Sequence, residues 1–211
     1  MNLKLIFHVP SGMPTPEYDQ LRKYIASIFS ITEEEWSFHR NLLSRKKLFK
    51  GEFLVEAGEV CNYVSFINRG SFRAYWDVDG HETTKNFFFE NEYASDYESF
   101  LTRKPARINV KAMEDCELVE LDYESVQSLY EQYPVWQKYG RLIAESLFLH
   151  LAQRSRDLLS KSPEELYLDL MHTRPHIIER VPLLHIASYL GVQPESLSRI
   201  RKRVMEVKRS A

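Results

Sequence analysis

Cysteine is scarce in this sequence of 211 residues, and its two cysteines, Cys61 and Cys116, lie far apart. Two isolated cysteines exclude a disulfide framework, a zinc site built on cysteines and the thiolate set of an iron–sulfur cluster. Long apolar runs are also missing: the run LKLIF near the N-terminus is far shorter than the roughly 20 residues that span a bilayer. No small-residue cleavage site of a secretory signal follows it. We therefore expect a cytoplasmic protein that does not bind a membrane.

A general excess of positive charge is absent too, because the formal net charge is −2. Residues 181–211 nevertheless contain six lysines and arginines against two glutamates, so they carry +4 and the preceding residues carry −6. An acidic body with a basic end indicates an anionic partner at that end. A solvated terminal helix would have the same composition, so composition alone leaves both interpretations open.

Hydrophobic spacing divides the chain into three zones. Residues 17–46 have helical spacing, with a capping box formed by Thr32 and Glu35. Residues 47–122 contain short aromatic and β-branched segments separated by regularly spaced glycines, which is typical of an all-β sandwich or barrel. Asp79 and Gly80 form a hairpin-turn pair between two of these segments. Helical spacing then returns.

One of the β segments, SFRAYWDV, alternates between two faces. Phe72, Ala74 and Trp76 share one face, while Arg73 and Tyr75 share the other. This alternation predicts a strand with one apolar side.

A long helix is predicted from Pro134 to about Leu159. It carries one apolar line at spacings of three and four, made of Trp136, Tyr139, Ile143, Leu147 and Leu151. A second line, made of Val135, Leu142 and Leu149, repeats every seven residues. One line is enough to dock the helix on its own domain, so the second indicates burial against another element, most simply a second copy of the chain. A helix enclosed within one chain is the alternative.

The last two predicted helices have the spacing of a helix-turn-helix. In the first, Leu184, Ile186, Ala187 and Leu190 are expected to face the core, and the small Ala187 would let the second helix cross closely. Gly191 permits the left-handed conformation that ends this helix, and Pro194 favours the start of the next.

The second of these helices separates into two sides. Leu197, Ile200 and Val204 are spaced to face the core, whereas Glu195 and Arg199 lie on the opposite side. An arginine donates two hydrogen bonds to guanine, and a glutamate accepts one from cytosine, so this side suits reading of the DNA major groove. The residues expected to contact DNA bases or phosphates are Glu195, Ser196, Arg199, Arg201, Lys202 and Arg203.

The order of these parts resembles the Crp/Fnr transcription regulators. The resemblance covers about residues 25 to 205, and its strongest local matches are KGEFLVEAGE, INRGSFRAYW, FFFENEYASDYESFL and IASYLGVQPESLSRIRK. It implies a homodimer that binds double-stranded DNA, contacts RNA polymerase and responds to a small-molecule effector. It also implies base contacts for Glu195 and Arg199.

The resemblance and the zones together predict an α+β fold. Residues 1–133 would form a β-roll sensor domain, of the double-stranded β-helix or jelly-roll type, similar to cyclic-nucleotide-binding domains. Residues 134–160 would form the dimerisation helix, and residues 161–211 an all-α helix-turn-helix domain.

Family members that bind cyclic AMP hold the ribose with a glutamate and the cyclic phosphate with an arginine. In the corresponding residues 91–112, Glu92 matches the glutamate, but Ala106 stands at the arginine and Arg107 at the serine that follows it. A buried phosphate without that arginine would lose a bidentate, charge-assisted pair. We therefore do not expect cyclic AMP to bind, assign no cofactor, and take Glu92, Ser99 and Arg107 as candidates for lining a pocket.

Other arrangements of this segment stay open. Arg107 could replace the arginine through a one-residue slip, although a slip in a strand turns the side chain to the other face. Arg103 or Lys104 could substitute for it. Aromatic side chains could instead fill the pocket, namely Phe87, Phe88, Phe89, Tyr93 and Tyr97.

Two other classes of function remain as alternatives. One is a module that responds to a cyclic nucleotide or another small ligand and acts on a protein partner. The other is a cupin-like enzyme, which would need closely spaced metal-binding histidines, whereas His81 is the only histidine in residues 47–122. No phosphate-binding loop or nucleophile motif stands out either, so we do not expect an enzyme or a metal site.

Overall fold

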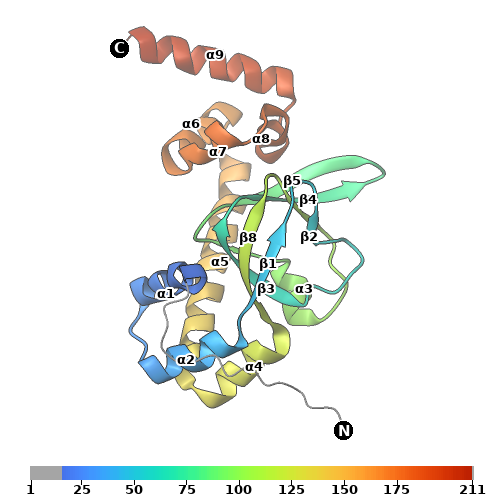
Figure 1. Ribbon diagram of the computed structural model, residues 1–211. Helices are drawn as coiled ribbons and strands as arrows, with labels where there is room; N and C mark the ends of the chain where they lie inside the picture. The colour runs from blue at the N-terminus through green and yellow to red at the C-terminus, as the bar shows by residue number, and fades with distance from the viewer. Residues whose placement is uncertain (1–15, 211) are drawn as a thin grey trace.

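The computed structural model describes residues 16–210, which form a β-sandwich with helices at both ends (Figure 1). The N-terminal and central elements are α1 Pro16–Ile28, α2 Glu33–Leu42, β1 Ser44–Leu48, β2 Phe53–Val55, β3 Tyr63–Arg69, β4 Phe72–Val78, β5 His81–Phe88, β6 Tyr93–Ala94, α3 Tyr97–Thr102, β7 Asn109–Ala112 and β8 Cys116–Asp122. The following helices are α4 Tyr123–Gln132, α5 Pro134–Ser160, α6 Pro163–Thr173, α7 Pro175–Arg180, α8 Leu183–Leu190 and α9 Pro194–Ser210.

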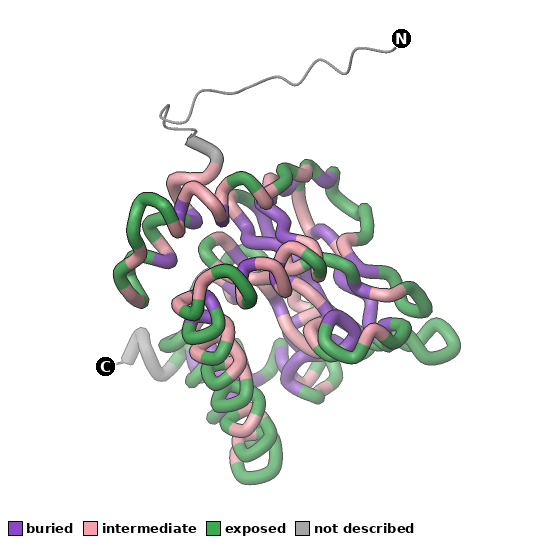
Figure 2. Tube along the Cα trace, turned by 90° about the horizontal axis from the view of Figure 1, so that it is seen from below, coloured by how far each residue is buried: buried purple, intermediate pink, exposed green. Residues whose placement is uncertain are grey.

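The strands form two antiparallel four-stranded sheets, in the orders β1-β8-β3-β6 and β2-β7-β4-β5. Apolar residues that are at most 2% exposed fill the space between them, including Ile67, Phe72, Ala74 and Leu118. Figure 2 shows the buried residues concentrated in the strands of the sandwich. The predicted β-sandwich is confirmed.

The hairpin between β4 and β5 turns at the residues that the sequence indicated. Val78 pairs with His81, and both residues between them have positive φ, 53° at Asp79 and 82° at Gly80. This is the two-residue turn whose twist matches that of the flanking strands.

Strand β4 departs from simple alternation. Phe72 and Ala74 are fully buried, but Arg73 and Tyr75 on the opposite face are only 6% and 3% exposed. Arg73 donates hydrogen bonds to Thr84 and to the Glu82 carboxylate, and its guanidinium lies 4.3 Å from the centre of the Tyr75 ring. The second face of this strand is therefore covered as well.

The helices α1, α2 and α4 and the beginning of α5 pack together with the sandwich in one apolar cluster. The predicted capping box at the start of α2 is confirmed, with the Glu35 amide donating to the Thr32 hydroxyl and the Thr32 amide donating to the Glu35 carboxylate. Helix α5 begins at Pro134 and is 27 residues long, in agreement with the prediction.

The C-terminal helices α6 to α9 build a second apolar cluster. Gly191 ends α8 at φ 71°, as expected, and the inward residues Ile186, Ala187 and Leu190 are at most 3% exposed. The expectation for Leu184 was wrong, because it is 61% exposed. Its position on the helix is turned away from the buried residues, whereas Leu183 has the inward direction.

Candidate functional site

Helix α9 presents one buried and one exposed side. Leu197, Ile200 and Val204 are at most 6% exposed and pack on the other C-terminal helices. The backbone amides of Ser196 and Leu197 donate to the Gln193 carbonyl, which fixes the first turn of the helix. The separation that periodicity predicted is therefore confirmed for the core side.

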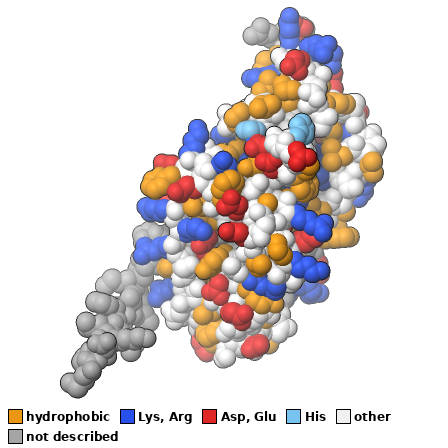
Figure 3. Space-filling model, turned by 90° about the vertical axis from the view of Figure 1, so that its right-hand side faces the viewer, with side chains coloured by type: hydrophobic (Ala, Val, Ile, Leu, Met, Phe, Trp, Pro, Cys, Tyr) orange, Lys and Arg blue, Asp and Glu red, His pale blue; other side chains and the backbone are white. Residues whose placement is uncertain are grey.

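The opposite side of α9 carries the residues that the sequence analysis expects to contact DNA. Glu195, Arg199, Arg201, Lys202 and Arg203 are exposed, and Ser196 is half-buried. The Arg199 Nε donates to the Glu195 carbonyl of the same helix at 3.4 Å. Figure 3 shows Lys and Arg side chains gathered at the end of the molecule formed by α9.

Arg203 differs from its neighbours because its Nη2 lies 2.5 Å from a carboxylate oxygen of Glu164, at the start of α6. Mutual hydrogen bonds of Ser162 and Glu165 form a capping box at the start of α6. The other N–H groups of Arg203 remain accessible, because its side chain is 59% exposed.

The three pocket candidates of the sandwich are engaged in different contacts. Ser99 accepts a hydrogen bond from the Cys61 amide and donates one to the Lys104 carbonyl. Arg107 is exposed, while the neighbouring Ala106 is buried. The Ala106 backbone is held by two hydrogen bonds, from its amide to the Glu59 carbonyl and to its carbonyl from Gly58.

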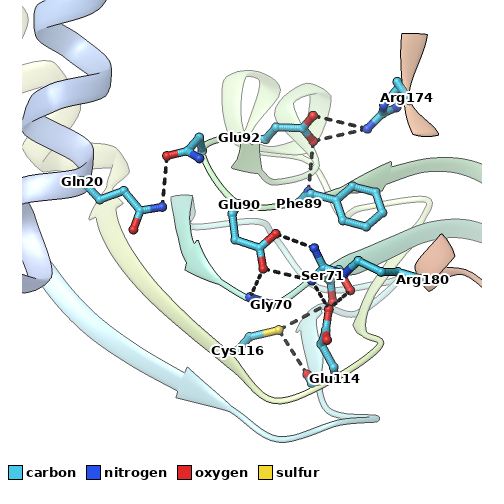
Figure 4. A network of polar contacts seen from close by, with 11 residues as sticks. Gln20, Gly70, Ser71, Phe89, Glu90, Glu92, Glu114, Cys116, Arg174 and Arg180 are labelled. Carbon is cyan, nitrogen blue, oxygen red and sulfur yellow. Dashed lines mark hydrogen bonds and ion pairs between the residues drawn. The ribbon is translucent and has the colours of Figure 1, made fainter. Parts of the chain in front are cut away.

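Glu92, the third candidate, faces the C-terminal helices. Its carboxylate accepts the Phe89 amide at 3.1 Å and lies 3.3 Å from Arg174 Nη2 (Figure 4). Burial raises the pKa of Glu92, and this effect exceeds the opposing effect of Arg174. A different carboxyl, that of Asp96, lies at the start of α3, and Asp96 is 4% exposed.

Arg103, which the sequence left open as a substitute phosphate ligand, is held by the fold. It has φ 57°, and its guanidinium donates to the carbonyls of Cys61 and Phe100 and to Asn62. The guanidinium also lies 4.5 Å from the centre of the Tyr123 ring. These contacts join the α3–β7 loop to the loop before β3.

A cavity of about 180 Å³ opens beside β3, lined among others by Val55, Cys61 and Ser65. It is smaller than the roughly 300–1,000 Å³ typical of ligand pockets. Within residues 16–210, no group of three or more His, Cys, Asp or Glu side chains could hold a metal ion.

The apolar lines of α5 divide along its length. Trp136 and Tyr139 are 2% and 9% exposed and lie in the chain's own core, where both rings contact Phe29. The Tyr139 hydroxyl is also 3.0 Å from that of Tyr93. Neither ring is accessible to a second copy.

Farther along α5 the apolar side chains become exposed. Ile143 and Leu147 are half-buried, and Leu151 is 48% exposed. The sequence analysis did not single out three exposed apolar residues of this half, which are Phe148 at 69%, Leu158 at 48% and Leu159 at 87%. It did identify Leu149, which is 66% exposed. Phe148 and Leu149 line a shallow hollow with Ala144 and Glu145. The repeat at sevens that identified Leu149 does not include the other three exposed residues, because its next position is Arg156.

One family model and several solved structures are similar to this chain. The family model of the cyclic nucleotide-binding domain matches residues 45–133. FixK2 from Bradyrhizobium japonicum has a similar structure, with a TM-score of 0.66 at 15% identity over 79% of this chain and 86% of that chain. A putative transcriptional regulator of the Crp/Fnr family from Eubacterium rectale gives 0.64 at 16% identity over 84% and 85% of the two chains.

The c-di-GMP-responsive global regulator CLP from Xanthomonas campestris is also similar, with a TM-score of 0.62 at 15% identity over 84% of this chain and 93% of that chain. At these identities the likeness shows a shared fold. A comparison with curated proteins found no match. Among residues 16–210, no helix is both long and apolar enough to cross a membrane.

Proposed function

We propose that this protein is a sequence-specific, DNA-binding transcription regulator of the Crp/Fnr type that acts as a homodimer. The observation that carries the proposal is the exposed pair Glu195 and Arg199 on α9, directly after a helix that ends at Gly191. The fold shared with regulators supports it, as does the +4 charge of residues 181–211 on an otherwise acidic chain.

In this proposal α9 enters the major groove. Arg199 donates two hydrogen bonds to guanine, and Glu195 accepts one from cytosine. Ser196 contacts a base as well, because it lies in the first turn of α9 and the N-terminal end of such a helix enters the groove. Arg201 and Lys202 bind phosphates and position the helix without reading sequence. Arg203 joins them through the N–H groups that Glu164 does not occupy.

The exposed half of α5 is the surface that pairs two copies. Phe148, Leu151, Leu158 and Leu159 are exposed on one side of the helix and form an apolar strip that a second α5 would cover. A two-fold axis would bring the same residues together from both copies. The two reading helices would then lie about 34 Å apart, one turn of DNA.

The pairing surface is tested by Phe148→Glu. We expect this variant to sediment as a monomer at a concentration where the unaltered protein is a dimer, because a buried carboxylate opposes association. Phe49→Glu is the matched control, since Phe49 is 68% exposed on the sandwich. Equal sedimentation of all three proteins would exclude pairing through α5.

The sandwich would act as a sensor for an effector other than cyclic AMP. Ala106 brings no charge to the position of the phosphate-binding arginine, Arg107 is exposed, and Arg103 is held by Cys61 and Asn62. Calorimetric titration with cyclic AMP should therefore give no heat of binding, whereas micromolar binding would contradict this assignment.

The DNA-binding proposal is tested by selection of bound duplexes from a random pool. The unaltered protein should enrich a two-fold symmetric sequence. Arg199→Ala should lose discrimination at one base pair in each half-site, at about 1–3 kcal/mol. Arg141→Ala, which removes an exposed arginine of α5, is the control and should select the unaltered sequence. Recovery of no sequence by the unaltered protein would reject the proposed function.

A further inference from the structure

The turn between β5 and β6, residues 89–92, lies against the C-terminal helices. Arg180, at the end of α7, forms a two-pronged ion pair with Glu90, with Nη1 2.7 Å from one carboxylate oxygen and Nη2 2.9 Å from the other (Figure 4). The same Nη2 lies 2.5 Å from Glu114. Paired hydrogen bonds of this kind fix orientation as well as distance.

The carboxylates of Glu90 and Glu114 are also held by hydrogen bonds from the sandwich. Glu90 accepts the Gly70 amide at 2.9 Å, and Glu114 accepts the Ser71 hydroxyl at 2.5 Å. Gly70 has φ 100°, and a Cβ there would lie 2.5 Å from the Cys116 sulfur and 2.9 Å from backbone atoms. The β3–β4 turn therefore requires glycine at the place where it holds Glu90.

A second arginine reaches the same turn from the end of α6. Arg174 Nη2 donates to the Phe87 carbonyl at 2.9 Å and lies 3.3 Å from Glu92. Phe89 is 3% exposed, its ring centre being 5.1 Å from the Arg180 guanidinium and 5.9 Å from that of Arg174.

The two ion pairs differ in strength. Burial would raise the pKa of Glu90, but hydrogen bonds from Arg180 and from backbone amides, including that of Gly70, lower it to about 2. Burial raises the pKa of Glu92 despite Arg174. The distances agree, because Arg180 lies 2.7 and 2.9 Å from the Glu90 oxygens and Arg174 lies 3.3 and 3.4 Å from those of Glu92. Arg180 therefore supplies the stronger contact.

Helix α8 is bound to β5, the edge strand of the sheet β2-β7-β4-β5. The Thr84 amide on the edge strand β5 donates to the Ser188 hydroxyl at 2.9 Å. Phe87 of β5 is fully buried against the C-terminal helices, with its ring centre 5.4 Å from that of Tyr189. The core of the C-terminal helices is thus completed by residues of the sandwich.

We propose that Arg174 and Arg180, together with Glu90, Glu92 and Glu114, form an orientation clamp that fixes the direction of α9 relative to the sandwich. None of the clamp residues lies on α9, so the clamp sets orientation and leaves the reading side of that helix exposed. A two-fold dimer magnifies such a device, because a tilt in each copy changes the distance between the two reading helices.

The clamp is also connected to the remainder of the sensor. The turn continues directly into β6, where the Tyr93 hydroxyl meets that of Tyr139 on α5, and then into α3. On its other side, Asn91 accepts a hydrogen bond from Gln20 of α1. A displacement of β6 or α3 would therefore move Glu90 and Glu92 and change the hold on both arginines.

The test uses the full-length chain and the variants Glu90→Gln, Arg180→Gln and the pair combined. Lys47→Gln is the control, because Lys47 pairs with Glu117 at 3.0 Å on the exposed side of the same sandwich. Amide exchange of Thr84 should accelerate about tenfold or more in the clamp variants, since local opening frees that amide. The double variant should resemble Arg180→Gln, because that substitution already removes the contacts of Arg180 with both Glu90 and Glu114. NMR relaxation should show increased motion of the C-terminal helices relative to the sandwich.

Unchanged Thr84 protection and unchanged motion of the C-terminal helices in both single variants would overturn the clamp. Faster amide exchange throughout the sandwich would show general unfolding and would also contradict the proposal. In that case the double variant should exchange faster than either single variant. Glu114→Gln, which spares the two-pronged pair, should give a smaller acceleration than Glu90→Gln.

The DNA readout rests on the proposed function. Affinity for the selected duplex should change at least about fivefold in Glu90→Gln, in a direction set by whether the held orientation fits both half-sites. No change would show that the clamp does not govern reading. If the unaltered protein selects no DNA, the proposed function fails while the exchange and relaxation results still decide the clamp.

Discussion

The arginines of the sandwich and its border contrast with those of α9. Arg73 bonds to Thr84 and Glu82 of the neighbouring strand β5, while Arg103 and Arg180 bond to groups 42 and 90 residues away. On α9, Arg201 is exposed, and Arg199 donates to a carbonyl of its own helix. The first set stabilises the fold, and the second remains accessible to a partner.

The contrast also explains why a net charge of −2 is compatible with DNA binding. In the sandwich, Lys46, Lys47 and Arg73 each lie beside a carboxylate that offsets their charge. The charges of α9 act at one end of the molecule, where the proposed DNA would lie.

The largest expected effect comes from removing the sandwich side chain that lies between the clamp arginines. Phe89→Ala should lower the free energy of unfolding by about 3–5 kcal/mol, because it leaves a cavity in the core of the C-terminal helices. Urea unfolding measures the change. Phe49→Ala, at a position 68% exposed, should remain within about 0.5 kcal/mol. Equal losses in the two variants would show that Phe89 does not support that core.

The same substitution on the two sets of arginines should separate their roles. Arg73→Gln should destabilise the fold by about 1–3 kcal/mol, since it leaves Thr84 and Glu82 without their donor. Arg199→Gln should change unfolding by less than about 0.5 kcal/mol. Thermal unfolding of both variants tests this, and a larger loss in Arg199→Gln would remove the distinction.

A smaller effect concerns a buried group that stays uncharged. His39 is 4% exposed, and its ring centre lies 4.4 Å from that of Trp136. Burial lowers the pKa of His39 to about 3, whereas the unfolded chain takes up this proton below about 6.5. The stabilisation is therefore complete above pH 6.5 and is lost as pH falls toward 3, by about 1.4 kcal/mol per pH unit.

This dependence is measured by urea unfolding at pH 7, 6 and 5. The variant His39→Phe should lack the His39 contribution, so its stability should fall less steeply than that of the unaltered protein. Identical slopes would show that His39 becomes protonated in the folded chain.

Local features were predictable from the sequence because their determinants lie within a few residues. The capping boxes at Thr32 and Ser162, the start of α5 at Pro134 and the left-handed Gly191 belong to this class. The core side of α9 was also predictable, since helical period alone determines it.

Features that depend on distant partners were not predictable. Arg73 and Tyr75 are buried although they lie opposite the inner face of β4, because the covering comes from elsewhere in the chain. Glu92 fits a ligand motif by sequence, yet it faces Arg174, which is 82 residues away. Trp136 matched a pairing stripe, but Phe29, which follows α1, and His39 of α2 already cover it.

The salt dependence of DNA affinity tests the central contrast most directly. We expect the logarithm of the binding constant to fall linearly with that of salt concentration, and Lys202→Gln to reduce the slope by about 1. Arg180→Gln should leave the slope unchanged, because Arg180 is paired with Glu90 and Glu114. A slope unaffected by Lys202→Gln but reduced by Arg180→Gln would contradict the account.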